Sequence, residues 1–373
     1  MEKNKKTKIL HLELPSDSRM LFMSDIHGDI QLFKEALEQA HFSEKDYLFV
    51  IGDMIEKADE WDNKKMLDFI IELNQNEKVF FMAGNCDEIF RFILPPLDKK
   101  KFLYYALELK KSILNDLAKD MNFPLSEDMD IDAFVSKVTR TYKAYFSFID
   151  SLPDVIFINE ELVLVHGGIQ DIHSIPSSAI DVLKFDRFLE VCPTQPIPML
   201  VGHNPTRNYR TDVASVNPIF DYKKNVICLD GGNNVVKGGQ LNVIILDSLK
   251  NKKFSFFALD HYPKYIIKDD ICYEEPQNLF SMRFGKNEVD VLTKDLDFYL
   301  VKPKGSLDEL WVHEEFMIFS EGKAYCYEGS NAFLNLKKGD QISIIKKAQP
   351  YSLVKHKGIL GLIESKYLYD ESI

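Results

Sequence analysis

Short apolar runs that each end in a cluster of polar and turn residues dominate the first half of the chain. The clusters are SDIHGD (24–29), GD (52–53), GNCD (84–87), HGG (166–168) and GHN (202–204). A short apolar run bounded by turn residues is typical of a strand buried on both faces of a sheet. Between the first three runs, residues 31–42 and 61–75 repeat apolar side chains at the spacing of one helix face. Strand, helix and strand in this order predict a parallel or mixed sheet, and therefore an α/β fold.

The composition is that of a folded, acidic protein. The 373 residues include 46 Lys and Arg against 58 Asp and Glu, which gives a formal net charge of −12. General binding to nucleic acid or to anionic lipid depends on clustered cations, so we expect neither partner. Five cysteines without CxxC spacing favour free thiols in a reducing compartment. Because no apolar stretch is long enough for a signal peptide or a membrane span, we expect a cytoplasmic protein without a membrane span.

The remaining parts of the chain differ in their pattern. Residues 102–121 and 131–152 have helical periodicity, which predicts a helical insertion over about residues 90–152. Residues 226–234 and 240–248 predict a pair of strands joined across a Gly-rich turn. After residue 260, short β-like pieces with many turn residues predict a linker and a small β-rich domain. We therefore expect two domains, at 1–260 and 261–373.

The polar side chains that could perform chemistry lie at the carboxyl ends of the predicted strands. In open α/β sheets this edge is where ligand sites form. Taken singly, each of these residues fits ordinary turn chemistry, but as an ordered set they predict a metal site. Two carboxylates, one amide oxygen and three imidazoles suit Mn, Fe or Zn better than a structural Cys-rich zinc site. The candidate ligands are Asp25, His27, Asp53, Asn85, His166 and His203.

The ordered motifs SDIHGD, GDMIEKAD, GNCDE, HGG and GHNPT resemble those of the calcineurin-like metallophosphoesterase superfamily. The chain is most similar in style to the bacterial serine/threonine phosphoprotein phosphatases and diadenosine tetraphosphatases, over roughly residues 18–248. The resemblance implies a four-layer α/β (α+β sandwich) fold of mixed β-sheets flanked by helices, with 1–260 as the catalytic domain. Residues 336–368 resemble a bacterial SH3-like module, which could bind a protein partner.

The same resemblance implies a hydrolase that acts on phosphoester bonds with two divalent metal ions. We expect Mn, with Fe or Zn as alternatives, and a metal-bridging hydroxide that attacks phosphorus in line. A phosphorylated protein or a small phosphoester is the expected substrate. The alternatives are a phosphodiesterase or a nucleotide or dinucleoside polyphosphate hydrolase, and a non-catalytic scaffold with this fold. The family pattern divides the ligands into Asp25 and His27 on one ion, Asn85, His166 and His203 on the other, and Asp53 bridging both.

Two departures from the family pattern fall on its leaving-group machinery. Cys86 stands where the phosphatases have a histidine that resembles a general acid, and a thiol is a poor hydrogen-bond donor. Glu56 replaces the aspartate that would orient this histidine, and Lys57 replaces an arginine that would grip phosphate. Losing a general acid costs about 10²–10⁴-fold, and less where the leaving group needs little protonation. We therefore expect aryl phosphates and diesters to be hydrolysed better than phosphoserine.

Further residues are expected to act around the metals. The predicted catalytic residues are Asp53, Asn85, Cys86, Asp87 and Arg187. The predicted cations for the substrate phosphate are Lys57, Arg91, Arg187 and Arg207.

Overall fold

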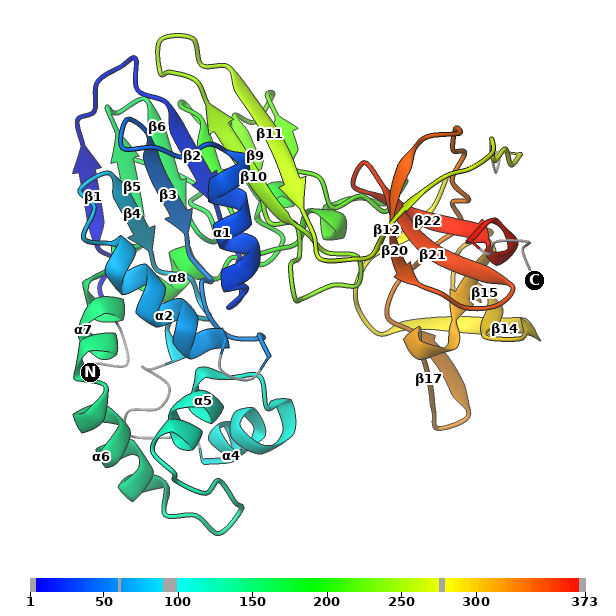
Figure 1. Cartoon of the computed structure of the whole chain (residues 1–373), viewed down its shortest axis with the longest axis horizontal. Helices are drawn as coiled ribbons and strands as arrows, with labels where there is room; N and C mark the ends of the chain where they lie inside the picture. The colour runs from blue at the N-terminus through cyan, green and yellow to red at the C-terminus, as the bar shows by residue number, and fades with distance from the viewer. Residues whose placement is uncertain (1–4, 60–61, 90–98, 275–278, 369–373) are drawn as a thin grey trace. The chain divides into compact units, whose positions relative to one another are not determined.

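The computed structural model describes residues 5–59, 62–89, 99–274 and 279–368 (Figure 1). The chain forms two compact units. The first contains Met1–Asn204, Pro218–Val235 and Leu241–Leu259, and the second contains Pro205–Asn217, Val236–Gln240 and Asp260–Ile373. Two short segments before residue 260 thus belong to the second unit, which the predicted division into 1–260 and 261–373 does not foresee.

The first unit contains a five-stranded sheet in the order β11-β10-β2-β3-β4. Its central strands β2, β3 and β4 run parallel, with Met20 opposite Tyr47 and Leu48 opposite Val79. Strand β10 is antiparallel to β2, and β11 is antiparallel to β10. The strands are β2 (Met20–Met23), β3 (Tyr47–Ile51), β4 (Val79–Met82), β10 (Leu241–Leu246) and β11 (Phe254–Leu259).

A second, six-stranded sheet of this unit has the order β1-β5-β6-β7-β9-β8. Strands β6, β7 and β9 run parallel to one another. The predicted strand pair near residues 226–248 is present as β9 and β10, but these strands lie in different sheets. The six strands are β1 (Ile9–Leu12), β5 (Val155–Ile158), β6 (Leu162–Val165), β7 (Met199–Val201), β8 (Ile219–Asp221) and β9 (Val226–Cys228).

The apolar core lies between the two sheets. Phe22 and Phe49 of one sheet belong to the same buried cluster as Leu164 and Leu200 of the other. Helix α1 (Ile30–Gln39) packs on β10 and β11 of the five-stranded sheet, and α2 (Asp62–Leu73) packs on α1 (Figure 1). Helices α8 (Ala179–Leu183) and α9 (Phe188–Val191) follow β6. Helices and mixed sheets combine in the α/β sandwich that the sequence predicts.

A helical insertion lies between β4 and β5, as predicted, but its helices are shorter than the sequence pattern suggests. The first predicted helix breaks at Lys110, which has a left-handed backbone, and Ser112 caps a new helix. The second breaks at Tyr142. The elements are α4 (Lys99–Leu103), the π-helix η1 (Tyr104–Leu109), α5 (Ile113–Asp120), α6 (Ile131–Thr141) and α7 (Lys143–Ser151).

The second unit is built from β-sheets, including the region that resembles an SH3-like module. One sheet has the order β12-β20-β21-β22, with strands β12 (Lys264–Ile266), β20 (Gln341–Lys346), β21 (Tyr351–His356) and β22 (Ile359–Glu364). A five-stranded sheet has the order β16-β15-β14-β18-β17, with strands β14 (Asn287–Asp295), β15 (Phe298–Pro303), β16 (Leu310–His313), β17 (Met317–Ser320) and β18 (Lys323–Cys326). Strands β13 (Ser281–Met282) and β19 (Gly329–Ser330) form a small ladder.

The described part of the second unit also contains the 3₁₀ helices η2 (Thr206–Tyr209), η3 (Glu314–Phe316) and η4 (Ser365–Leu368). The early segments of this unit are held to it by its own sheet. The Leu360 N–H donates to the Ala214 carbonyl at 2.7 Å, and the Val216 N–H donates to the Gly358 carbonyl at 2.9 Å. Across the parts of the chain that the structure describes, no helix is long and apolar enough to cross a membrane.

Candidate metal centre

Five loops place the predicted ligands at the carboxyl ends of five strands. Because β2, β3 and β4 are parallel in one sheet and β6 and β7 are parallel in the other, these ends meet at one edge of the sandwich. The ligands come from β2 (Asp25 and His27), β3 (Asp53), β4 (Asn85), β6 (His166) and β7 (His203).

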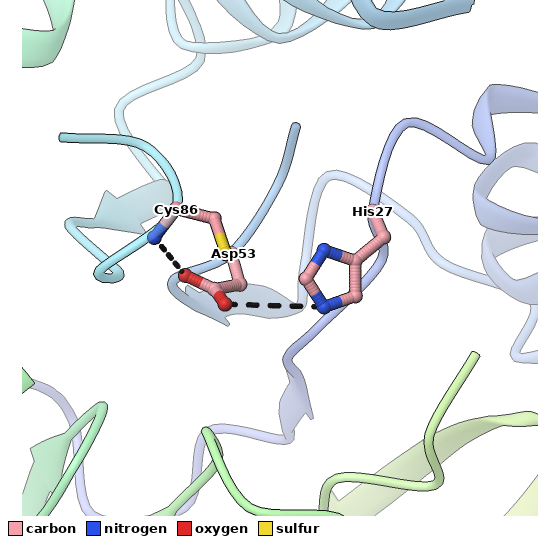
Figure 2. Close-up of side chains that lie close together, drawn as sticks. All are labelled: His27, Asp53 and Cys86. Carbon is pink, nitrogen blue, oxygen red and sulfur yellow. Dashed lines mark hydrogen bonds and ion pairs between the residues drawn. The ribbon is translucent and has the colours of Figure 1, made fainter. Parts of the chain in front are cut away.

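Asp53 lies at the centre of the cluster. One Asp53 carboxylate oxygen is 3.8 Å from His27 Nε2, and the other is 3.3 Å from His166 Nε2. The ligand atoms of Asp25, Asp53 and His166 lie within 4.8 Å of one another, and so do those of His27, Asp53 and Cys86. Figure 2 shows Asp53 between His27 and Cys86, with the Cys86 N–H donating to Asp53 Oδ1 at 2.7 Å. Asp53 therefore belongs to both groups, as a bridging ligand would.

Two histidines have the orientation that metal ligation requires. His166 Nδ1 is 2.8 Å from the Ile51 carbonyl, and His27 Nδ1 is 3.4 Å from the Ile55 carbonyl. A carbonyl oxygen that binds one ring nitrogen fixes the tautomer, so that the other nitrogen has a lone pair to offer a metal. In both residues that other nitrogen is Nε2, the atom next to Asp53. Asn85 Oδ1 lies 3.3 Å from His166 Nε2, so it joins the same group.

His203 reaches the cluster through both its backbone and its ring. Its N–H donates to Asp25 Oδ2 at 3.0 Å, and its ring centroid is 5.4 Å from that of His166. Its Nε2 lies 2.8 Å from Asp186 Oδ1. This arrangement is the histidine–carboxylate pair that commonly supports a metal ligand, with Nδ1 left for the metal. Asp186 is not among the residues predicted from the sequence, although the adjacent Arg187 is.

The carboxylates and imidazoles shift one another's pKa values in the way that a cation site requires. Burial raises the pKa of Asp25 to about 6, and the neighbouring Asp53 adds to this shift. Burial also opposes ionisation of Asp53, but the charge and hydrogen bond of His166 outweigh it and hold its pKa well below the usual range. Burial opposes protonation of His166, yet Asp53 and Asp25 raise its pKa to about 10. The field of these anions therefore favours a cation at this place.

Asp25 and His27 also have the properties of ligands for a divalent metal ion. Asp25 Oδ1 is buried and has no hydrogen-bond partner within the described residues. An unpaired buried carboxylate oxygen is costly, and coordination to a cation removes that cost. Burial, followed by the nearby Lys57 cation, lowers the pKa of His27 to about 3, so this imidazole is neutral and able to coordinate.

The loops that carry the ligands have strained backbones. Asp25, His27, Asp53 and His203 have φ values of 54°, 50°, 52° and 69°, in the left-handed region that non-glycine residues rarely adopt. Such strain is typical of functional sites and persists only where surrounding contacts enforce it. The loop after β4 comes close to the backbone of Asp53 at Gly84. Only glycine fits there, because a Cβ atom would lie 2.1 Å from the Asp53 nitrogen.

Asp87, one of the predicted catalytic residues, enforces this geometry. Its fully buried carboxylate accepts N–H groups of Asp53 at 2.8 Å, Met54 at 2.9 Å, Ile55 at 3.3 Å and Gly84 at 2.8 Å. These bonds join the loop after β3 to the loop after β4. Asp87 is therefore a positioning residue for Asp53 in this structure, with its oxygens directed at backbone donors.

The predicted phosphate-binding cations differ in where they lie. Lys57 is close enough to Cys86, Asp53 and Asp25 for their charges to raise its pKa although burial opposes this, so the ammonium is protonated beside the cluster. Arg187 pairs with Glu190, through Nε at 2.9 Å and Nη2 at 2.7 Å.

The remaining two predicted cations are Arg207 and Arg91. Arg207 belongs to the second unit, where its buried guanidinium is 2.8 Å from Glu328 Oε2 and is already neutralised. This pairing gives no support to the predicted phosphate contact. Arg91 lies outside the described residues.

Glu56 has a different role from the orienting one that the family pattern suggests. Its Oε1 accepts the Ser112 hydroxyl at 2.9 Å and the Ile113 N–H at 2.8 Å, both at the start of α5. Next to it, the Lys57 N–H donates to the Lys111 carbonyl at 2.8 Å. The loop after Asp53 is thereby tied to the helical insertion.

The turn after β9 supplies positioning residues that were not predicted from the sequence. Asn233 Nδ2 donates to the Ile26 carbonyl at 3.0 Å, and Asn234 Nδ2 donates to the His27 carbonyl at 3.1 Å. Asp230 is buried, and one of its carboxylate oxygens has no hydrogen-bond partner among the residues that the structure describes. Burial together with Asp25 raises the pKa of Asp230 well above the usual range. The pattern that predicts the metal ligands is a polar residue directly after a strand, and LDGGNN has the same pattern.

The mixed α/β sandwich gathers carboxylates and imidazoles at one sheet edge, a donor set that suits divalent metal ions. The chain belongs to the calcineurin-like phosphoesterase family, whose model matches residues 18–224. It is therefore a hydrolase that acts on phosphoester bonds, in a family that works with divalent metals. No curated protein matches the chain.

Several solved structures resemble this one at low sequence identity. A diadenosine tetraphosphatase is 16% identical, with 68% of this chain and 99% of that chain covered and a TM-score of 0.43. A serine/threonine phosphatase from Saccharomyces cerevisiae is 13% identical, with 73% and 86% covered and a TM-score of 0.38. A cold-active protein-tyrosine phosphatase of a Shewanella species is 14% identical, with 68% and 83% covered and a TM-score of 0.39.

Proposed function

We propose that this phosphoesterase is a dinuclear enzyme that hydrolyses phosphoesters of the serine/threonine phosphatase type, with manganese as its metal. The position of Asp53, shared by two groups of candidate ligands, is the observation that supports two ions rather than one. These groups place Asp25 with His166 and His27 with Cys86. In the division that the family pattern implies, Asp25 and His27 would hold one ion, and Asn85, His166 and His203 the other. Iron or zinc would also suit these oxygen and nitrogen donors.

When bound, two divalent ions supply charge stabilisation for the phosphoryl oxygens and an activated water for in-line attack. The chain's own residues orient this chemistry. Asp87 fixes the backbone of Asp53, and Asp186 holds the ring of His203. Lys57 adds a protonated cation beside the carboxylates, where a dianionic phosphate needs one.

The test is hydrolysis of p-nitrophenyl phosphate and of bis(p-nitrophenyl) phosphate with added manganese. We expect turnover of at least one ester, and turnover of neither by protein that is shown to contain metal would overturn the proposal. His173→Ala is a matched control, because His173 is exposed and belongs to neither group of candidate ligands. This variant should keep the wild-type rate.

A phosphodiesterase or a nucleotide or dinucleoside polyphosphate hydrolase is the second candidate. Burial and then Asp53 raise the pKa of Cys86 well above its usual range, so the residue is a neutral thiol at the place of the family's imidazole. A leaving group that needs no protonation suits such a site better than an alkoxide. A panel of phosphopeptides, dinucleoside polyphosphates and cyclic and linear diesters with manganese would rank these substrates.

A non-catalytic scaffold is the third alternative, and the retained ligand set argues against it. A scaffold has no need to keep six metal ligands, and metal analysis that finds close to two ions per chain would count against it. The cytoplasmic location, and the binding of a protein partner by the β-rich C-terminal region, stay predictions from the sequence.

A further inference from the structure

A thiol lies within reach of one ion of the proposed dinuclear site. The ligand atoms of His27, Asp53 and Cys86 lie within 4.8 Å of one another, and Figure 2 shows these three side chains together. Because metal–ligand bonds are about 2.0–2.3 Å long, two donors on one ion lie about 3–4.5 Å apart. The three atoms are therefore close to the spacing of donors that share an ion. In the family pattern, the position of Cys86 has a proton donor and no metal ligand.

His27 and Asp53 present donor atoms to each other. His27 Nε2 is 3.8 Å from Asp53 Oδ2, and Nδ1 of the same ring is 3.4 Å from the Ile55 carbonyl, which leaves Nε2 for an ion. The other carboxylate oxygen, Asp53 Oδ1, accepts the Cys86 N–H at 2.7 Å and lies 3.3 Å from His166 Nε2. Asp53 Oδ2 is thus the oxygen that an ion beside His27 would bind, and Oδ1 serves the group of His166.

The side-chain amide of Asn85 uses the Cys86 sulfur as an acceptor. Asn85 Nδ2 donates to Cys86 Sγ at 3.4 Å, while Asn85 Oδ1 lies 3.3 Å from His166 Nε2. Donors directed at a ligand atom are typical of the contacts that orient and tune metal ligands. A neutral sulfur is a weak acceptor, and the bond strengthens when the sulfur carries a negative charge. The surroundings of the sulfur therefore suit a thiolate.

We propose that Cys86 is a metal ligand and binds, together with His27 and Asp53, one of the two ions. This inference rests on the dinuclear site of the proposed function. When the sulfur forms its bond to the ion, the thiol proton passes to solvent. Three protein ligands leave a further coordination position for water or substrate, as in catalytic zinc sites.

The sulfur also changes which metal the site prefers. A thiolate is a softer donor than a carboxylate or an imidazole and favours zinc over manganese. We therefore expect zinc at the ion bound by His27, Asp53 and Cys86. The manganese of the proposed function then belongs to the group of Asp25, Asp53 and His166, which contains no sulfur.

Cobalt(II) is the probe for the test, because a thiolate bonded to cobalt gives a charge-transfer absorption in the near ultraviolet that oxygen and nitrogen ligands do not give. Full-length protein that has been stripped of metal is titrated with cobalt chloride. Wild type should show this band, and Cys86→Ser should lose it but keep the weaker visible absorption of cobalt in the other group. Cys192→Ser and Cys272→Ser, which replace a buried and an exposed thiol outside both groups, should keep the band.

Two further measurements separate coordination from a general structural effect. Cys86→Ser should raise the Kd for zinc by about tenfold or more, which is the least that losing a hydrogen-bond partner of a ligand costs, and should change the Kd for manganese less. In wild type, bound zinc should protect Cys86 from alkylation by iodoacetamide. The exposed Cys272 should be alkylated at the same rate with and without zinc.

The outcomes are distinct from those of the turnover assays. Wild type that binds two cobalt ions without the charge-transfer band would overturn the role of Cys86. A band that persists in Cys86→Ser, or an unchanged rate of Cys86 alkylation with zinc bound, would also overturn it. Hydrolysis of neither ester would overturn the proposed function and leave the cobalt spectrum to decide the ligand. Wild type that binds neither cobalt nor zinc would overturn both.

Discussion

At the scale of single residues, the metal centre depends on backbone conformations that its side chains would not select by themselves. Asp25, His27 and Asp53 all have positive φ, at a cost of about 1–3 kcal/mol each. The carboxylate of Asp87 offsets part of this cost through its bonds to backbone N–H groups. A motif residue can therefore be essential to the site without touching a substrate.

The cysteine of GNCD can be replaced by the residue that the family pattern has there. Cys86→His should raise kcat for phosphoserine relative to bis(p-nitrophenyl) phosphate, because an imidazolium protonates an alkoxide and the diester has a leaving group that needs no proton. We expect this ratio of rates to rise about tenfold or more. The gain should stay below the about 10²–10⁴-fold that a general acid contributes, because Glu56 is bound to Ser112 and does not orient the new histidine. Steady-state rates with both substrates measure the ratio.

Cys192→His is the matched control for this change, since Cys192 is a buried cysteine of the same unit without a role in the cluster. An unchanged ratio in Cys86→His, with metal content at the wild-type level, would contradict the interpretation of that position.

The sequence predicts the six candidate ligands because each follows a recognisable apolar strand. The sequence does not predict Asp186 as part of the site, because this residue lies in a loop that follows no apolar strand and reaches His203 only in the folded chain.

At the scale of secondary-structure elements, the insertion is anchored by a side chain that the family pattern would place in catalysis. Glu56 joins the loop after β3 to the first residues of α5. Because this carboxyl group is buried, its ionisation affects the free energy of unfolding.

Burial raises the pKa of Glu56 to about 8. The folded-state pKa lies above the unfolded one, so the stabilisation that this linkage contributes is complete below about pH 4.3 and is lost as the pH rises towards 8. Glu56→Gln keeps a carbonyl acceptor but cannot ionise. The free energy of unfolding of this variant, relative to wild type, should therefore increase by about 1 kcal/mol or more between pH 5 and pH 8.

Urea unfolding of both proteins across this pH range measures the effect. Glu72→Gln, at an exposed position of α2, should show no such change with pH. A constant difference between Glu56→Gln and wild type would mean that the carboxyl group does not titrate in this window.

Element boundaries show where sequence patterns lose information. Residues 102–121 keep one apolar period across Lys110, whose left-handed backbone and the Ser112 cap divide the segment in the structure. Likewise, 226–234 and 240–248 have the pattern of a hairpin, but β9 and β10 pair with different sheets. Periodicity reports which face of a segment is buried, and tertiary contacts decide where the segment stops and what it pairs with.

At the scale of the whole molecule, the clustered carboxylates make stability depend on bound metal. A chelator should lower the melting temperature of the first unit, because a ligand at 100 times its Kd stabilises by about 2.7 kcal/mol. For a unit of this size we expect a fall of about 5 °C or more. Calorimetry with and without chelator measures it.

Asp53→Asn tests the same linkage through the residue shared by both ligand groups. It should abolish turnover, reduce the metal bound per chain and make the melting temperature nearly independent of chelator. His173→Ala should behave as wild type in all three respects. A large chelator effect that persists in Asp53→Asn would place the metal elsewhere in the chain.

The division of the chain into units has a practical consequence for truncation. The segments that contain Ala214 and Val236 belong to the second unit and pack on Leu360 and Ile345 of its sheet. A shortened chain ending near residue 260 would strip both segments of their partners and expose their apolar side chains. Low expression or solubility of this fragment would then result from the exposed apolar side chains of the two segments. Loss of activity in the fragment would therefore not show that the C-terminal region takes part in catalysis.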